Sequence, residues 1–344
     1  MLMVIFGAGA SFDSAQSARI QVVGGAVRYD GLPYRPPLAN DLFADRSRAF
    51  AAHIKAYPKM HAILPLLRER SQKSVEEVLE SLQSEAGVYP ERHRQLAAVR
   101  FYLRDLLWEC TDQWIEHTSG VTNYSPLIDQ ILRWHVTEEP IALVTFNYDL
   151  LLENALRSFG FRWSPPARFL DSHTILKVFK LHGSVDWAQF VDRPFEGAGA
   201  SNIIDSAEKI KPTGLYVSVF KRQDEKEGKL LFPAIAIPVQ SKDESTFACP
   251  GNHLESLKQL VPDVNKLLIV GWQAREAHFT SILRSRLQKL DHLTVVSGDS
   301  HEGKKVLDYF VSQVPRAEGA NAHVCAGGFT DFVVNREGDE FFKA

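Results

Sequence analysis

The chain has 344 residues, of which 45% are hydrophobic and 24% charged, and this composition is ordinary for a folded globular protein. A net charge of −3 argues against a broad nucleic-acid-binding face, although a local basic groove stays compatible with it. The three cysteines lie too far apart for a disulfide framework or a four-ligand zinc module. We therefore expect a cytoplasmic protein without a bound metal.

The sequence predicts neither a membrane helix nor a signal peptide. No apolar run approaches the roughly 20 residues that a membrane helix needs. The N-terminus lacks a basic start and a cleavage site, so Leu2 to Phe6 is predicted to be a buried first strand and not part of a signal peptide.

The first candidate site follows this strand, in the small residues Gly7-Ala-Gly-Ala-Ser11. Small residues let the backbone approach a phosphate, and the N–H groups of such a turn can bind it. The alternative is a tight turn from strand to helix, because a lone Gly-x-Gly is a weak motif. Phe12 to Pro37 is a long connection rich in glycine and proline, in which Val22-Val23 and Val27-Arg28-Tyr29 could pair as a hairpin.

From Leu38 to His135 the pattern is helical. Asn40 or Asp41 is expected to cap a helix towards Tyr57, and Ser74 with Glu77 forms a capping box for the helix Val75 to Ala86. A long helix is predicted for Glu91 to His117, with an apolar stripe that favours core packing over a partner-binding surface. Another helix is expected from Ser125 to Trp134. These segments predict an all-helical module, residues 38–139, inserted into an α/β domain formed by residues 1–37 and 140–344.

The second candidate site ends the predicted strand Ile141 to Thr145. Phe146-Asn-Tyr-Asp149 stands at its C-terminal end, before the apolar helix Leu150 to Leu156. Asn147 and Asp149 are suited to bind a ribose or hold a water. Capping is the alternative role, since aspartate at a helix start is a good N-cap.

The third candidate site is His182, which a β-rich run, Val178 to Leu181, delivers into a glycine turn. A histidine at a strand end can act as a base near neutral pH, but a loop histidine without catalytic function is the commoner case. The region from Phe190 to Gly228 is expected to be irregular, and its charge run from Lys221 to Lys229 to be solvated surface. Leu230 to Val239 is predicted to be an extended segment.

Strands and helices alternate again at the C-terminal end. Strands are predicted at Lys266–Val270, His292–Val296 and Asn321–Cys325, and helices at Ala277–Leu290, Gly303–Val314 and Phe329–Val334. Each strand leads into a turn with Gly, Ser or Asp. This repetition predicts an α/β fold, a Rossmann-like parallel sheet with helices on both faces, and a ligand across the C-terminal ends of the strands.

In this order the motifs resemble the sirtuin-like family, which carries a GAGxS turn, an Asn-x-Asp motif and a Leu-His-Gly motif, each at the end of a strand. Here they are Gly7-Ala-Gly-Ala-Ser11, Asn147-Tyr-Asp149 and Leu181-His-Gly183, and Gly271-Trp-Gln273 resembles the later glycine loop. The resemblance covers residues 1–15 and about 140–334. Zinc-dependent deacylases of the family have two CxxC pairs and a glutamine before the asparagine; this chain has neither, and Phe146 replaces the glutamine.

These departures make the chain similar to the bacterial sirtuin-like branch that hydrolyses NAD, often in anti-phage defence. The resemblance implies NAD as a substrate and no metal. It implies that Asn147 positions the nicotinamide ribose or the water, that Asp149 orients this group, and that His182 is the base. The remaining residues implied to bind NAD lie in the first turn and in two later loops: Ala8, Gly9, Ser11, Phe12, Gly271, Gln273, Ser297 and Gly298.

The resemblance also implies control of the activity. A toxic NAD glycohydrolase would be held inactive until it assembles as a homo-oligomer or meets a separate partner, such as a sensor or a DNA-translocating ATPase. We expect no sensor domain fused to this chain. Two alternatives remain open: a non-catalytic module that senses NAD or ADP-ribose, and, with less support, a zinc-free deacylase or ADP-ribosyltransferase.

Overall fold

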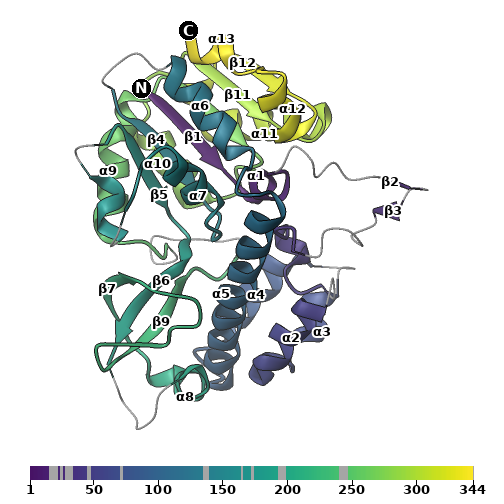
Figure 1. Ribbon diagram of the computed structural model, residues 1–344, viewed down its shortest axis with the longest axis vertical. Helices are drawn as coiled ribbons and strands as arrows, with labels where there is room; N and C mark the ends of the chain where they lie inside the picture. The colour runs from purple at the N-terminus through teal and green to yellow at the C-terminus, as the bar shows by residue number, and fades with distance from the viewer. Residues whose placement is uncertain are drawn as a thin grey trace.

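The computed structural model describes residues 1–14, 22–23, 26–27, 34–44, 48–69, 73–134, 139–163, 166–171, 174–192, 199–239 and 247–343 (Figure 1). The two short strands β2 (Val22–Val23) and β3 (Ala26–Val27) pair antiparallel, as the hairpin prediction required. Most of the predicted connection from Phe12 to Pro37 lies outside the described residues, as does His135 at the predicted end of the helical stretch.

A six-stranded parallel sheet forms the upper half of the molecule (Figure 1). Its strand order is β12-β11-β10-β1-β4-β5. The strands are β1 (Leu2–Phe6), β4 (Ile141–Thr145), β5 (Leu176–Lys180), β10 (Lys266–Val270), β11 (His292–Val296) and β12 (Asn321–Cys325). Phe6, the last residue of β1, pairs in register with Val270 on one side and with Thr145 on the other. The strands β4 and β5 lie on one side of β1, and β10, β11 and β12 lie on the other, so the strand order reverses at β1. This reversal is the switch point at which open α/β sheets bind their ligands.

Helices cover both faces of this sheet, and the predicted Rossmann-like α/β fold is confirmed. The central strands are apolar without alternation because both of their faces are buried, and β1 and β4 have no exposed residue. The helices of this half are α1 (Ala8–Phe12), α6 (Tyr124–Trp134), α7 (Leu151–Ser158), α9 (Gly251–Leu260), α10 (Ala277–Arg286), α11 (Ser300–Gln313), α12 (Gly328–Val334) and α13 (Asp339–Lys343).

Four further helices pack together below the sheet: α2 (Arg48–Ala56), α3 (Leu64–Arg68), α4 (Val75–Glu85) and α5 (Glu91–His117). The predicted capping box of α4 is present, since Ser74 and Glu77 bond to each other's backbone N–H. The predicted limits of α5 are also confirmed. The capping prediction for Asn40 and Asp41 is wrong, because both lie in a separate 3-10 turn that ends before α2 begins.

The region predicted to be irregular instead contains a second sheet, which is a correction. Its antiparallel order is β7-β6-β9-β8, formed by β6 (Gly183–Val191), β7 (Pro212–Ser218), β8 (Glu225–Lys226) and β9 (Lys229–Ile235), with α8 (Ala200–Asp205) between β6 and β7. In this sheet β6 pairs with β9, a partner distant in the chain. Pairing over such distances leaves little local pattern in the sequence.

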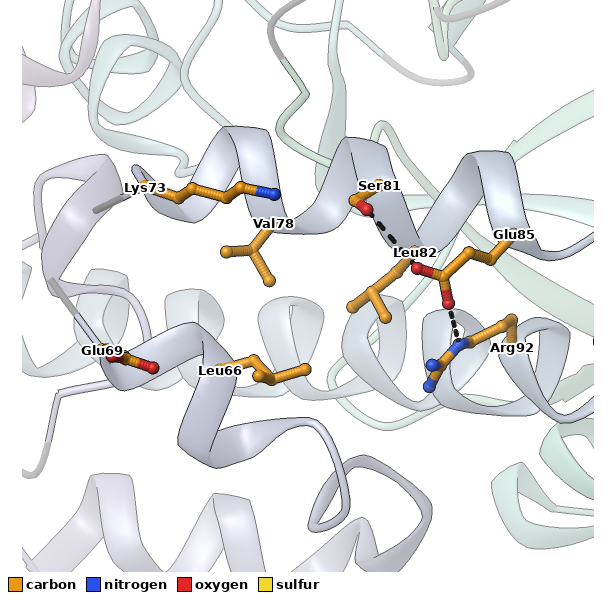
Figure 2. A pocket seen from close by; sticks show the side chains of 8 residues that line it. All are labelled: Leu66, Glu69, Lys73, Val78, Ser81, Leu82, Glu85 and Arg92. Atoms are coloured by element: carbon orange, nitrogen blue, oxygen red, sulfur yellow. Dashed lines mark hydrogen bonds and ion pairs between the residues drawn. The ribbon is translucent and has the colours of Figure 1, made fainter. Parts of the chain in front are cut away.

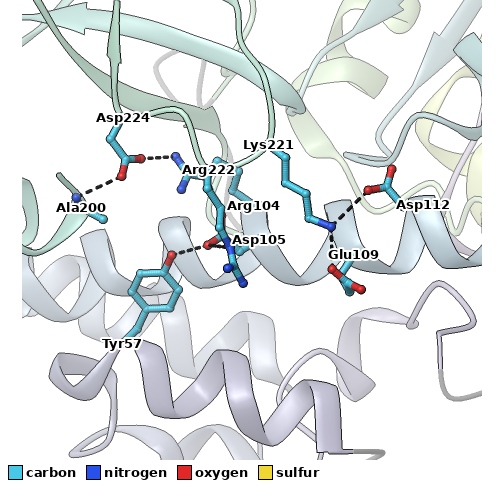
Figure 3. Close-up of polar contacts among 9 residues, drawn as sticks. All are labelled: Tyr57, Arg104, Asp105, Glu109, Asp112, Ala200, Lys221, Arg222 and Asp224. Carbon is cyan, nitrogen blue, oxygen red and sulfur yellow. Dashed lines mark hydrogen bonds and ion pairs between the residues drawn. The ribbon is translucent and has the colours of Figure 1, made fainter.

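The charge run in this sheet is not simply solvated, because part of it fastens the β7–β8 loop to α5 (Figure 3). Lys221 Nζ lies 2.6 Å from Glu109 Oε2 on α5, and Asp224 Oδ1 lies 2.7 Å from Nη1 of the buried Arg104. Asp224 also accepts a hydrogen bond from the Ala200 N–H at the start of α8. These contacts hold the second sheet against the helices, so that α5 runs beside β6 and β9 (Figure 1).

Candidate functional site

Gly9 and Gly271 bring the first turn and the later loop into backbone contact at the switch point. The Gly9 N–H donates to the Gly271 carbonyl at 3.1 Å. A Cβ on Gly9 would lie 2.8 Å from the Gly271 Cα, and a Cβ on Gly271 would lie 2.3 Å from the Ala10 nitrogen. Gly271 also has a φ of +59°, which disfavours any side chain. The Gly9 N–H is already bonded to Gly271. Gly9 therefore contributes to this turn by lacking a side chain, which lets the two backbones approach each other.

Asn147 is held by hydrogen bonds that fix the orientation of its amide. Its Nδ2 donates to the Gly7 carbonyl at 2.9 Å and to Ser11 Oγ at 3.0 Å, and it lies 3.3 Å from the Tyr124 hydroxyl. Because a carbonyl only accepts, the nitrogen must face Gly7. The opposite atom, Oδ1, receives no hydrogen bond from the described part of the chain. The amide thus keeps one acceptor for a ligand.

Buried Asp149 joins the same hydrogen-bonded group through the Ser11 side chain. Burial raises the pKa of its carboxyl, while Lys180 and a hydrogen bond from the Ser11 side chain oppose that rise. The carboxylate also accepts the Leu151 N–H at 3.1 Å, in the first turn of α7. Leu150, and not Asp149, is the N-cap residue of α7, and the orienting role of Asp149 stays a prediction. Lys180 in turn donates to the Asp149 carbonyl at 2.5 Å and pairs with buried Glu153 at 2.7 Å.

His182 lies beside Asn147 through the residues on either side of it. Its buried ring has its centroid 4.8 Å from that of Phe146 and 6.2 Å from that of Tyr148. The glycine after it is required, since Gly183 has a φ of +83° and a Cβ there would lie 1.8 Å from the Ala234 carbonyl oxygen. The structure therefore brings together the ends of β4 and β5, with the His182 ring against the two residues that flank Asn147.

An aromatic wall of Phe146, Trp272 and Phe279 adjoins these residues, and no sequence motif predicts it. The Phe146 ring stacks on Trp272, with centroids 5.5 Å apart and planes at 13°, and meets Phe279 edge-on at 5.3 Å. Trp272 donates its indole N–H to Glu276. Phe146, which replaces the deacylase glutamine, is thus an apolar packing residue with no acid or base of its own.

The other predicted NAD-binding residues follow the ends of β1, β10 and β11. Gln273 and Gly298 are exposed and Ser297 is half-buried, with its N–H bonded to the Cys325 carbonyl. Phe12 lies under the guanidinium of Arg35, whose carbon is 4.0 Å from the ring centroid. Buried Arg35 and Tyr124 belong to this surrounding shell, and neither stood in a recognisable motif.

Two further features lie apart from this site. A cavity of about 250 Å³ between α3, α4 and the start of α5 has an apolar floor of Leu66, Val78 and Leu82 and a rim of charged side chains (Figure 2). It contains no predicted site residue. Within the described ranges, no group of three His, Cys, Asp or Glu side chains could hold a metal ion, and no helix is long and apolar enough to span a membrane.

Comparison with known families identifies the chain. The SIR2-like domain family matches residues 141–312, which is half of the 344-residue chain. The chain belongs to the SIR2-like domain family. The predicted resemblance to sirtuins is confirmed at this level, and an NAD-binding site of the sirtuin type is supported. The matched span of this SIR2-like chain contains Asn147, Asp149, His182 and the Gly271 loop, whereas the first turn lies outside it.

Solved structures similar to this SIR2-like chain are sirtuins of low identity. Sir2 in complex with the inhibitor EX-527, 2′-O-acetyl-ADP-ribose and a deacetylated p53 peptide is 14% identical, with a TM-score of 0.38, over 100% of this chain and 95% of that one. Sir2Tm bound to a propionylated peptide is 13% identical, with a TM-score of 0.39, over 100% and 94%. No curated protein matches the chain. The family assignment therefore rests on the domain match.

Proposed function

We propose that this chain is an NAD glycohydrolase, which cleaves NAD to nicotinamide and ADP-ribose. The observation that carries the proposal is the Asn147 amide, fixed through its nitrogen and open at Oδ1, between Phe146 and Tyr148, whose rings contact His182. A rigid acceptor next to a base at this edge is suited to a ribose hydroxyl or a water.

In this proposal NAD lies across the C-terminal ends of the strands. The pyrophosphate lies against the first turn, which the close contact between Gly9 and Gly271 holds at the end of β10. The adenine side lies over Gly271, Gln273, Ser297 and Gly298. The nicotinamide ribose then lies between Asn147 and His182, whose ring contacts the two residues that flank Asn147.

The reaction breaks the bond between the anomeric carbon and the pyridine nitrogen, and nicotinamide leaves as a neutral molecule. The ribosyl group passes through an oxocarbenium-like state. His182 takes a proton from the attacking water or from a ribose hydroxyl. Asn147 Oδ1 accepts a hydrogen bond from the other of these two groups. The aromatic wall of Phe146, Trp272 and Phe279 keeps bulk solvent from the ribose. Positioned proton transfer contributes on the order of 10²–10⁴ in rate.

Deacylation is disfavoured by Phe146 itself. The ring packs between His182 and Trp272, so no side chain at this position can work on the ribose as an amide would. The stronger alternative is a sensor that binds NAD or ADP-ribose and never cleaves it, because a binding module needs the same pocket.

Turnover separates the two functions. Purified protein is incubated with NAD, and nicotinamide release is followed by chromatography for the wild type, Asn147→Ala and His182→Ala; calorimetry measures NAD binding by each. The hydrolase predicts release that falls by about 10² or more in either variant while His182→Ala still binds NAD. Tight NAD binding without nicotinamide release in any condition would establish the sensor.

We further propose that the enzyme is a cytoplasmic, toxic effector of anti-phage defence, held off until it assembles or meets a partner. Exposed apolar side chains on the helical module, Leu66, Val88 and Tyr89, offer surface for such contacts. The partner would be a homo-oligomer neighbour, a sensor or a DNA-translocating ATPase. Light scattering tests this: a particle mass that stays monomeric under all activating conditions contradicts control by assembly.

A further inference from the structure

The half-buried Arg100 differs from three buried cations of the described chain, each of which lies near a carboxylate. Arg35 lies 3.9 Å from Asp13, Arg104 lies 2.8 Å from Asp105, and Lys180 lies 2.7 Å from Glu153. Arg100, on α5, donates its Nε to the Ile235 carbonyl at 3.2 Å. No carboxylate among the described residues pairs with it, and its two terminal nitrogens form no hydrogen bond to them.

Arg100 stands next to the candidate site through two consecutive carbonyls at the end of β9. The Ile235 carbonyl accepts from Arg100, and the next one, of Ala236, accepts from the Tyr148 hydroxyl at 3.0 Å. The Ala236 N–H donates to the His182 carbonyl at 2.9 Å. The helical segment therefore places a guanidinium on the same short stretch of backbone that holds Tyr148 and His182.

Among the described residues, nothing near Arg100 supplies a negative charge paired with its guanidinium. Burial lowers the pKa of the guanidinium to about 10, so it stays protonated at neutral pH. Burial likewise raises the pKa of the nearby Tyr148 phenol, which is therefore neutral and supplies no counter-charge. The Phe232 ring, with its centroid 5.5 Å away, gives some cation–π stabilisation. An unpaired cation in such a place is unfavourable, and a bound anion would relieve it.

We propose that Arg100 forms an anion subsite beside His182, which takes a small molecule carrying a carboxylate or a phosphate. The side chain is partly exposed, so a ligand can reach it, and its two terminal nitrogens form the fork that binds such oxyanions in two places. The subsite rests on the proposed function in one respect: it lies near His182, beside which that proposal places the nicotinamide ribose. The inserted helices thus contribute directly to what the pocket recognises.

Nicotinate and nicotinamide form a matched pair of probes, because they differ in a carboxylate against an amide. Calorimetry of each probe, and of inorganic phosphate, is run with the wild type, Arg100→Gln, Arg100→Lys and Arg94→Gln. The last variant is the control, since Arg94 lies on the same helix and pairs on the surface with Glu91. The wild type and the control should bind nicotinate on the order of ten-fold more tightly than nicotinamide. Arg100→Gln should abolish that preference, and Arg100→Lys should keep part of it.

Inorganic phosphate distinguishes the two kinds of anion. If phosphate binds the wild type but not Arg100→Gln, the subsite accepts oxyanions in general; if only nicotinate binds, it is a carboxylate site. Equal affinity of the wild type for nicotinate and nicotinamide, without phosphate binding, overturns the proposal even if Arg100→Gln does not fold. A preference that survives in folded Arg100→Gln overturns it too. NAD turnover is measured separately, so an anion subsite without nicotinamide release would contradict the hydrolase alone.

Discussion

Replacing Gly271 by alanine tests the backbone contact on which the candidate site is built. Two costs follow from the structure. Holding alanine at a φ of +59° costs about 1–2 kcal/mol. The new Cβ would also lie 2.3 Å from the Ala10 nitrogen and 2.5 Å from the Gly9 carbonyl carbon. Forcing atoms into a filled space costs about 1–3 kcal/mol more. We expect a total loss of about 2–5 kcal/mol, with the first turn pushed away from the end of β10.

Gly228→Ala is the matched control, because it separates the two costs. Gly228 has a φ of +73°, but a Cβ there would meet nothing within 4 Å. Only the backbone cost of about 1–2 kcal/mol should appear. Urea unfolding of both variants gives the difference, and calorimetry with NAD shows whether the displaced turn still binds. If Gly271→Ala is no less stable than Gly228→Ala and binds NAD normally, the reasoning about close backbone contact is wrong.

Three further changes test other parts of the structure. Lys180→Met should cost about 3–5 kcal/mol in urea unfolding, because it leaves Glu153 charged and buried without its partner, and adding Glu153→Leu should restore most of the loss. Tyr124→Phe should lower kcat by about ten-fold with KM nearly unchanged, since the hydroxyl that touches Ser11 and Asn147 is lost; an unchanged kcat would show that it does not position the amide. Burial lowers the pKa of His253 from 6.5 to about 4, although its hydrogen bond to the Pro166 carbonyl opposes this shift. The free energy of unfolding is therefore highest above pH 6.5 and falls by up to about 3 kcal/mol as the pH drops to 4. Thermal unfolding across this range should lose that acid-side slope in His253→Gln.

The parallel sheet was predictable because its signals are local. Leu2–Phe6 and Ile141–Thr145 are short apolar runs that end at small or polar residues, and both are strands with those limits. The capping box of Ser74 and Glu77 and the long helix at Glu91–His117 also depend on nearby residues. In each case the pattern that stabilises the element lies within the element itself.

What escaped prediction depends on contacts between distant residues. The antiparallel sheet pairs β6 with β9, and α8 lies between these strands in the chain. The charge run around Lys221 predicts solvated surface, because its partner Glu109 lies on the distant helix α5. Asn147, Asp149 and His182 were proposed from motifs, and their roles in catalysis stay predictions. Tyr124 contacts Asn147 from α6, and Arg100 contacts the end of β9 from α5. Nothing local in the sequence marks these contacts between distant residues.

The central claim is hydrolysis of NAD at this site, and the oxygen source tests it most directly. The protein is incubated with NAD in ¹⁸O-labelled water, and the products are measured by mass spectrometry beside those of Asn147→Ala. The account predicts nicotinamide and ADP-ribose in equal amounts, one labelled oxygen in the ADP-ribose, and loss of both products in the variant. Bound NAD that is never consumed, or ADP-ribose formed equally by folded Asn147→Ala, would contradict it.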